Sequence, residues 1–328
     1  MRKTGKWLVT SLIVMVGLTV GSAIAADYPT RPITIINPMA PGGTRDVQAR
    51  AFASIAEKYL GQPLPVVNKP GASGLIGGLA GAQATPDGYT ITVNSTGETC
   101  ALEWEIANGR KPSFNRDDII PIGAFSLSPT IVVVPYNSPW KTLTDMIKDC
   151  KVRPGYYAYG VGGLYGGSHL PGVLLMKAAG ITARIVPYKG GGEALTATVG
   201  GHVHFSTQFP PTSIPLVRGN KLRALAVQSD RRLKAMPDLP TVKELGIDAL
   251  WYQWTGITVP KKTPQPIVEK LKEVVKKVAE EKSFITMMEN QGDEIRYMSA
   301  EELGKYWEEE SIMIGKLMTE LAKKAAEK

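Results

Sequence analysis

The stretch ITIINPMAPGGTRDVQARAFASIAEKYLG, at residues 33–61, decides the fold. Its first four residues form a β-branched run that ends at Asn37-Pro38, as is typical of a short buried strand. Gly61 ends a helix, because glycine readily adopts the left-handed conformation that closes a last turn. A strand, a Pro-Gly-Gly turn and a helix in this order predict the start of a βαβ unit. Apolar residues recur along one face of this helix at Val47, Ala51, Ile55 and Tyr59.

The alternation of strands and helices continues outward along the chain. Ser299 and Glu302 form a capping box for a last helix, and strands that alternate with helices indicate an α/β fold with parallel sheets. Apolar, β-rich runs predict further strands at 64–67, 89–93, 130–134, 184–186, 205–208 and 222–227. Helical patterns occupy 75–84, 170–179 and 193–199, and the apolar face of another helix contains Ile267, Leu271, Val274, Val275 and Val278.

The length and composition indicate an ordered globular protein with two lobes. The chain has 328 residues, of which 43% are hydrophobic and 21% are charged, with 34 glycines and 24 prolines. This composition excludes a disordered or collagen-like chain. A length of about 300 residues is close to the size at which a single core stops growing, so we expect two lobes.

Residues 1–26 have the pattern of a secretory signal peptide: a basic start, an apolar run over 7–20, and small residues that allow cleavage after Ala25 or Ala26. The apolar run is shorter than the roughly 20 residues that a transmembrane anchor needs. Removal of the segment takes away three of the 38 basic residues and none of the 30 acidic ones, which leaves a net charge of +5. No later stretch is long and apolar enough to span a bilayer, so we expect a soluble periplasmic protein.

Cys100 and Cys150 are the only cysteines in the chain. An oxidising compartment permits a disulfide between them, but the distance between the two residues in the fold decides whether it forms. The segments around them have the pattern of different lobes, which favours two free thiols.

The chain contains no recognisable catalytic, metal-binding or nucleic-acid-binding motif. His202 and His204 would share one face of a strand, but no third ligand stands at a metal-binding spacing, and we expect a solvent-facing pair. Ser168 lacks the second glycine of a nucleophile elbow. The Lys and Arg residues alternate with acids on the helices, which is typical of a solvated face. We therefore expect a protein that is not an enzyme, with no cofactor, no metal and no nucleic-acid partner.

Two glycine clusters, at 71–77 and 160–167, lack the spacing of nucleotide-binding loops. Glycine nevertheless lets the backbone approach a ligand and point successive N–H groups at it. Where such a loop opens a helix, the free amides and the helix dipole favour an anion. This chemistry suits a carboxylate as well as a phosphate.

A series of short motifs resembles, in identity and order, the solute receptors of tripartite tricarboxylate transporters, the TctC or Bug family. The resemblance covers nearly the whole chain after the signal segment. The motifs are YPTRPIT at 28–34, PGG at 41–43 with Asp46 and Ala49-Arg50, VNKPGA at 67–72, TPDGYT at 85–90, SHL at 168–170, VPYKG at 186–190, GGHV at 200–203, GNKLRALAV at 219–227 and PDLPTV at 237–242.

The resemblance implies a two-lobed periplasmic binding protein fold of type II, in which each lobe is a Rossmann-like sheet flanked by helices and the ligand cleft lies between the lobes. Such a monomer closes like a Venus flytrap on a small carboxylate and delivers it to the membrane subunits of a tripartite transporter. In the family the C-terminal helices complete the first lobe. We therefore expect lobe one at 27–125 plus 254–328 and lobe two at 126–253.

The same resemblance implies which loops contact the ligand. The loop over 39–46 would hold one carboxylate through backbone amides and ordered water, and residues 94–96 would add donors from the same lobe. The segments 160–169 and 207–209 would close over the other end. The expected ligand-binding residues are Met39, Ala40, Gly42, Gly43, Thr44, Arg45, Asp46, Asn94, Ser95, Thr96, Gly162, Gly166, Ser168, His169, Thr207, Gln208 and Phe209.

Three departures from the family pattern bear on the ligand. Thr44-Arg45 stands where many members have a glycine and a threonine. An Arg45 that reaches the cleft would clamp a carboxylate and favour a di- or tricarboxylate or an acidic aromatic ligand, whereas an outward Arg45, which we favour, is a surface charge. Tyr165 lengthens the second glycine loop, and His204 replaces a common acid. Four aromatic residues are candidates for the pocket wall or, more commonly, for packing: Trp104, Trp251, Tyr252 and Trp254.

Two functions therefore stay open. The first is a carboxylate receptor for a tripartite transporter, which predicts reversible stoichiometric binding without turnover. The second is a signalling receptor of the same fold that passes its closed state to a membrane sensor kinase. The two functions differ in the partner and not in the ligand.

Overall fold

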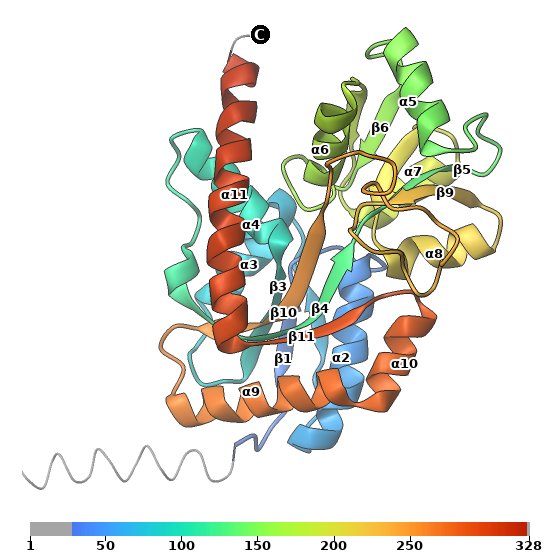
Figure 1. Cartoon of the computed structure of the whole chain (residues 1–328). Coiled ribbons are helices and arrows are strands. Elements are labelled where there is room, and N and C mark those ends of the chain that lie inside the picture. The colour runs from blue at the N-terminus through green and yellow to red at the C-terminus, as the bar shows by residue number, and fades with distance from the viewer. Residues whose placement is uncertain (1–27, 327–328) are drawn as a thin grey trace, which may run out of the picture.

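The computed structural model describes residues 28–326 and contains two β-sheets flanked by helices (Figure 1). We call the two parts lobe one and lobe two. The sheet of lobe one contains β1 (Thr34–Asn37), β2 (Val66–Asn68), β3 (Thr90–Ser95), β4 (Ile119–Pro129), β10 (Tyr252–Pro260) and β11 (Ile295–Ser299). The sheet of lobe two contains β5 (Ile131–Pro135), β6 (Ala158–Val161), β7 (Arg184–Pro187), β8 (Phe205–Gln208) and β9 (Leu222–Val227).

Five strands of each sheet share one topology, and β11 adds an antiparallel edge strand to the sheet of lobe one. Their strand orders are β11-β4-β10-β3-β1-β2 and β7-β6-β8-β5-β9. In each sheet three strands pair in parallel, as predicted, but β10 and β5 run antiparallel to their neighbours. Each of these two strands enters its sheet from the other lobe, which reverses its direction. The prediction of wholly parallel sheets is therefore wrong, and the sheets are mixed.

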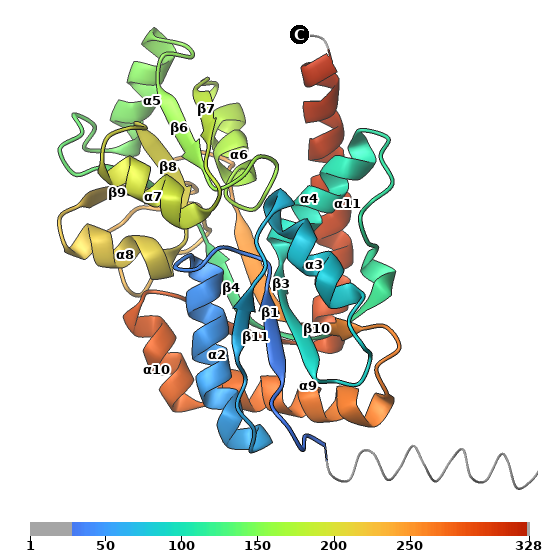
Figure 2. The ribbon, with the colours of Figure 1, turned by 180° about the vertical axis from the view of Figure 1, so that it is seen from behind.

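Helices cover both faces of each sheet (Figure 2). In lobe one, α2 (Thr44–Leu60), α9 (Gln265–Glu280) and α10 (Lys282–Asn290) lie on one face, and α3 (Leu75–Ala82), α4 (Thr96–Ala107) and α11 (Ala300–Ala326) on the other. In lobe two, α5 (Leu143–Val152) and α6 (Leu170–Ala179) lie opposite α7 (Gly191–Val199) and α8 (Pro210–Arg218). Short 3-10 turns cover Ala72–Gly74 and Arg116–Asp118.

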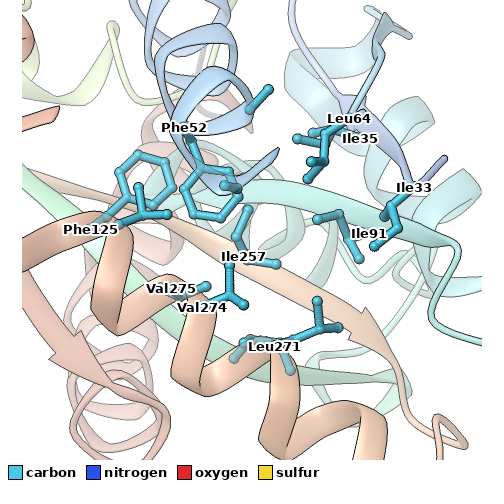
Figure 3. Close-up of a cluster of buried hydrophobic side chains, with 14 of the residues drawn as sticks. Ile33, Ile35, Phe52, Leu64, Ile91, Phe125, Ile257, Leu271, Val274 and Val275 are labelled. Atoms are coloured by element: carbon cyan, nitrogen blue, oxygen red, sulfur yellow. The ribbon is translucent and has the colours of Figure 1, made fainter. Parts of the chain in front are cut away.

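The main core of lobe one lies between its sheet and the pair α2 and α9 (Figure 3). Side chains from β1, β3, β4 and β10 share this core with the apolar face of α9 that the sequence predicts, and all five predicted residues of that face are buried. The rings of Phe52 on α2 and Phe125 on β4 stack at 5.2 Å between centroids. The predicted capping box before α11 is confirmed, because the Ser299 N–H donates to Glu302 at 2.8 Å and the Glu302 N–H to Ser299 Oγ at 3.2 Å.

The chain changes sheets at Thr130 and returns over residues 228–251. The lobe boundaries that we expect after residues 125 and 253 fall inside β4 and β10, a few residues from these changes of sheet. As a result, β4 and β10 lie side by side where they cross from one lobe to the other.

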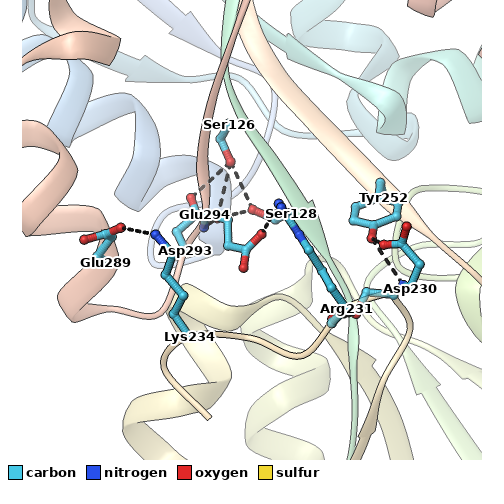
Figure 4. A network of polar contacts seen from close by, with 10 residues as sticks. Ser126, Ser128, Asp230, Arg231, Lys234, Tyr252, Glu289, Asp293 and Glu294 are labelled. Atoms are coloured by element: carbon cyan, nitrogen blue, oxygen red, sulfur yellow. Dashed lines mark hydrogen bonds and ion pairs between the residues drawn. The ribbon is translucent and has the colours of Figure 1, made fainter. Parts of the chain in front are cut away.

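A polar network stabilises the region where the crossing strands meet (Figure 4). The Asp293 carboxylate, completely buried before β11, accepts hydrogen bonds from Ser126 and Ser128 on β4 and from Gln48 on α2. Burial raises the pKa of Asp293 above its ordinary value, although these hydrogen bonds oppose the shift. Two exposed ion pairs beside it join the lobes: Arg231 with Glu294 at 2.7 Å and Lys234 with Glu289 at 3.4 Å.

The predicted signal segment, 1–26, lies outside the described residues. Among residues 28–326, no helix combines the length and the apolar composition that a membrane span requires. Cys100 on α4 and Cys150 on α5 are both buried and free, so the favoured prediction for the two thiols is confirmed.

Candidate ligand-binding site

A cleft of about 1010 Å³ lies between the two lobes. Lobe one contributes the loop between β1 and α2, together with Val47, Ser73 and Gln253. Lobe two contributes the loop between β6 and α6, the glycines at the start of α7, and the end of β8 with the first turns of α8. Loops at the carboxyl ends of parallel strands are where open α/β sheets place their ligands.

Two helix N-termini open onto this cleft from opposite lobes. The N-cap residues are Gly43 for α2 and Gly190 for α7, and neither helix has a side chain that caps its first amides. A Cβ built on Gly190 would lie 3.5 Å from Ala40 Cβ, and one built on Gly192 would lie 3.7 Å from Gly42 O. The two N-termini therefore lie close together, and their free amides and dipoles create a positive potential without any cationic side chain.

Asp46 shapes the lobe-one loop instead of lining the cleft. Its carboxylate accepts hydrogen bonds from the Gly42 N–H at 3.0 Å and from Asn68 Nδ2 at 2.8 Å, and it pairs with Arg50 at 3.1 Å. Burial opposes ionisation, but the bonds from Arg50, Asn68 and Gly42 outweigh it and hold the pKa of Asp46 below its ordinary value. Gly42 has a φ of 77°, which glycine adopts without strain. The other five predicted residues of this loop line the cleft: Met39, Ala40, Gly42, Gly43 and Thr44.

Arg45 also lines the cleft, and the residue is only 4% exposed. The expectation of an outward surface charge is therefore wrong. The guanidinium contacts the Glu98 carboxylate and Ser95 Oγ at the start of α4, while its Nε has no partner in the protein. Gly97 leaves room for it, because a Cβ there would lie 2.8 Å from Arg45 Nη2. The cation is thus neutralised by a buried carboxylate, and its Nε–H is left without a partner in the protein.

Asn94, Ser95 and Thr96 do not form a loop and do not line the cleft, in contrast to the predicted arrangement. They are the end of β3 and the first residue of α4, and all three are buried. Ser95 caps α4, where its Oγ accepts from the Gly97 N–H at 3.1 Å. Thr96 donates to Glu310 at 2.6 Å, and Asn94 donates to Thr258 at 2.8 Å. These three residues therefore belong to the buried framework of lobe one and not to the cleft wall.

Three of the four residues predicted in the loop before α6 line the cleft, namely Gly162, Gly166 and Ser168. The fourth, His169, does not. Ser168 Oγ accepts from the Gly162 N–H at 2.9 Å, which fixes the loop. The His169 side chain is buried, its Nδ1 accepts from the Tyr165 N–H at 2.9 Å, and its Nε2 has no partner. Burial lowers the pKa of His169 to about 4, so the ring is neutral at pH 7.

The three residues predicted at the end of β8 also differ in whether they line the cleft. Thr207 is buried beneath the cleft, where its hydroxyl bonds with Tyr159 and with Ser168 O. Gln208 and Phe209 line the cleft, and Gln208 Nε2 is buried without a partner. Gln208 and Arg45 are therefore two unpaired donors on the cleft wall, one from each lobe.

Several cleft residues are absent from the sequence prediction. The run Gly190-Gly191-Gly192 before α7 repeats the pattern of Gly42-Gly43 before α2, so the same signal could have identified it. Gln253 lies on β10, a strand that the sequence analysis does not predict. His202 also lines the cleft and is exposed, whereas His204 is half-buried and its Nδ1 accepts from the Ala158 N–H at 3.0 Å. The expectation of a solvent-facing pair is thus wrong for His204.

Contacts across the cleft show that the lobes are closed on one another. Thr44 Oγ1 lies 3.0 Å from Thr212 Oγ1, and Ser73 Oγ donates to Leu164 O at 2.9 Å. Outside the cleft, Trp104 on α4 stacks on Tyr165 with centroids 3.4 Å apart and planes at 7°. Trp251 and Trp254 are buried, and none of the four aromatic candidates for the pocket wall lines the cleft.

The described residues contain no cluster of three His, Cys, Asp or Glu side chains that could hold a metal ion. In the cleft wall the titratable side chains are Arg45, Tyr188, Glu193 and His202. The arrangement provides donors and shape for a ligand, and its chemistry is that of recognition.

Known proteins are similar to this chain in sequence and in architecture. Residues 48–322 match the model of the TctC family, described as the tripartite tricarboxylate transporter family receptor. Protein BugT of Bordetella pertussis is 31% identical over 290 residues, which cover 86% of this chain and 89% of BugT. A Rhodopseudomonas palustris protein solved with adipate has a TM-score of 0.84 and 28% identity, over 90% of this chain and 98% of that one. The protein MatC of the same organism, solved with bound malate, has a TM-score of 0.81 and 26% identity, over 89% and 100% of the two chains.

Proposed function

The chain belongs to the tripartite tricarboxylate transporter receptor family, TctC, a family of periplasmic solute-binding proteins, and from this premise we propose that it captures a small carboxylate between its lobes and delivers it to the membrane subunits of such a transporter. In this proposal residues 1–26 direct the chain to the periplasm. The protein binds one ligand reversibly and returns it unchanged.

The observation that carries this proposal is the pair of uncapped helix N-termini at the cleft. The starts of α2 and α7 present free amides from opposite lobes, and an anion placed between them is held by hydrogen bonds and by both helix dipoles. Among the described residues that line the cleft, Arg45 is the only Lys or Arg, and Glu98 already neutralises it. A carboxylate bound by backbone amides needs no further cation.

Two additional donors support the assignment of the ligand as a carboxylate. Arg45 Nε and Gln208 Nε2 are both buried without a partner, and each belongs to a residue of the cleft wall. A buried donor without an acceptor costs about 1–3 kcal/mol, so a ligand that supplies carboxylate oxygens would relieve both. The adipate and malate in the two structural relatives are ligands of this chemical class.

The mechanism is closure of the two lobes about the crossing strands. The carboxylate first binds the amides of α2 on lobe one, and contacts from α7 and Gln208 on lobe two then favour the closed form. The ligand stabilises closure only by its greater affinity for that form.

A substitution at Gly43 tests the site directly. A Cβ there meets only Ala40 O, at 3.7 Å, so Gly43→Val should fold while its branched side chain blocks the approach of a ligand to the α2 amides. We expect calorimetric titration with carboxylates to show affinity reduced at least about tenfold, the equivalent of losing one charge-assisted hydrogen bond.

The matched control is Gly304→Val on α11, where a Cβ meets nothing within 4 Å. It should bind as the unmodified protein does. Unchanged carboxylate affinity in Gly43→Val would remove the α2 N-terminus from the site and contradict the proposal.

A further inference from the structure

One part of the cleft wall is apolar. We call it the apolar section and define it as Val47 on α2, Leu195 on α7, and Phe209, Pro211, Pro215 and Leu216 at the start and along one side of α8. Leu195 and Leu216 belong to the same hydrophobic cluster of lobe two. Val47 and Leu216 remain half-buried, so their apolar surface is still open to a ligand.

The start of α8 offers no donor, in contrast to α2 and α7. Pro210 and Pro211 occupy its first two positions and have no N–H. The next two amides, of Thr212 and Ser213, already donate to Phe209 O at 3.3 and 3.2 Å. An anion at this helix end would therefore find no free amide.

The threonine hydroxyls next to the apolar section already have partners. Thr196 Oγ1 donates to Gly192 O at 3.0 Å, and the hydroxyls of Thr44 and Thr212 bond to each other at 3.0 Å. A carboxylate group placed against the apolar side chains would be desolvated without a partner among them.

The volume of the cleft allows a carboxylate site at the helix N-termini and a separate apolar subsite. Its volume of about 1010 Å³ lies at the upper end of the range for pockets that enclose drug-sized ligands. Gly190 and Gly192 lie near Ala40 and Gly42, which brings the two helix N-termini together, while the apolar section includes residues of α8 up to Leu216, four residues after Thr212.

We propose that the preferred ligand is a monocarboxylate with an aliphatic or aromatic body: its carboxylate lies at the N-termini of α2 and α7, and its body lies on the apolar section. This inference rests on the proposed function, because it assumes that the cleft binds a carboxylate. It goes beyond that function by assigning the rest of the ligand to a named surface.

The test compares two ligands of equal length in calorimetric titrations of the full-length gene product after purification and removal of bound ligand. Hexanoate and adipate differ in that adipate replaces the terminal methyl group by a second carboxylate. We expect hexanoate to bind about tenfold more tightly, since the second carboxylate of adipate would meet no donor. In the series butyrate, hexanoate and octanoate, each added methylene that is buried should improve affinity about fourfold.

Matched variants locate the effect on the apolar section. Leu216→Ser and Val47→Ser should flatten the dependence of affinity on chain length. Val217→Ser, on the same helix but outside the cleft wall, should keep the full dependence and controls for any loss of stability in α8.

The possible outcomes separate this inference from the proposed function. Adipate binding as tightly as hexanoate or more tightly, or an affinity independent of chain length, would overturn the apolar section as a subsite and leave carboxylate binding intact. Failure of folded protein to bind any of the four carboxylates would overturn both proposals.

Discussion

At the residue scale, the buried pair of Arg45 and Glu98 links the loop over 39–46 to α4. Both side chains are almost completely buried, at 3% and 0% exposure. Arg45 belongs to the first turn of α2, whereas Glu98 completes the capping box of α4 by accepting from the Ser95 N–H at 2.9 Å. The pair therefore fixes the α2 N-terminus relative to the α4 N-terminus.

Removal of one member of this pair should be costly. Arg45→Met leaves the Glu98 carboxylate buried without its counter-ion, and we expect the free energy of unfolding to fall by about 3–5 kcal/mol in urea denaturation. The double variant Arg45→Met/Glu98→Gln has no uncompensated charge and should recover most of the loss. If Arg45→Met and the double variant are equally unstable, the two charges are not energetically coupled in the way the contact suggests.

A second buried carboxylate makes stability depend on pH. Glu310 on α11 accepts from Thr96 Oγ1 at 2.6 Å and from Trp254 Nε1 at 2.9 Å, and burial raises its pKa to about 7 against those bonds. The folded state therefore holds this proton more tightly than the unfolded chain does. The stabilisation is complete below the unfolded pKa, near 4.5, and is lost as the pH rises through 7.

We expect the unmodified protein to lose on the order of 3 kcal/mol of stability from this group between pH 4.5 and pH 8. Glu310→Gln should lack that part of the pH dependence, while Glu309→Gln, at the exposed neighbouring residue, should keep it. Denaturation curves at four pH values measure the difference. Parallel pH profiles for Glu310→Gln and the unmodified protein would show that Glu310 titrates normally.

At the element scale, α4 and the loop before α6 join the lobes on the side away from the polar network of the crossing strands. Tyr165, the residue that lengthens this loop, has a positive φ of 58° and stacks on Trp104. Beside the stack, Leu170 of α6 packs in one apolar cluster with Ile314 and Met318 of α11. Lobe two is thus held against α4 and α11 by apolar contacts outside the ligand cleft.

Loss of this stack should weaken closure. Tyr165→Ala removes an aromatic pair worth about 0.5–1.5 kcal/mol beyond its buried area, so ligand affinity should fall about fivefold, mainly through faster dissociation. Stopped-flow measurement of the intrinsic tryptophan fluorescence, while a bound carboxylate dissociates, gives the dissociation rate. Tyr156→Ala, at an exposed position of lobe two, is the control. An unchanged dissociation rate in Tyr165→Ala would mean that the stack does not contribute to closure.

The strands and helices that could be predicted are those with a strong local pattern. The largely apolar run at Leu222–Val227 and the apolar face of α9 can each be identified from the sequence, and the structure has both elements. The strand β10 could not be predicted, since it is specified by its position between β3 and β4 and its sequence YQWTGITVP does not alternate clearly. A strand whose neighbours are distant in the chain carries its signal in tertiary contacts.

The residues of the cleft, too, could be predicted only where the sequence pattern is local. Gly42 and Gly43 were accessible to prediction because the turn before a helix has a local signature. The positions of Ser95 and Thr96 were not, because they depend on where β3 ends and α4 begins, and on the capping bond that Ser95 makes. The direction of Arg45 depends on Glu98, 53 residues further along the chain.

At the scale of the whole molecule, two lobes whose sheets share five strands of one topology face each other across a cleft, and the wall of that cleft combines free amides with apolar surface. The lobes are joined by β4 and β10 with their polar network and by the contacts around Trp104. A ligand that bridges the lobes adds contacts available only in the closed form, and this difference is the energy that drives closure.

The most direct test of carboxylate capture is a thermal-shift screen of the protein after unfolding and refolding to remove bound ligand. The panel contains aliphatic mono- and dicarboxylates, tricarboxylates, aromatic carboxylates and amino acids. A ligand at 100 times its dissociation constant should add about 2.7 kcal/mol to the free energy of unfolding, which is a readable shift. We predict a clear stabilisation by one class of carboxylate; a refolded, cooperatively melting protein that no carboxylate stabilises would contradict the account.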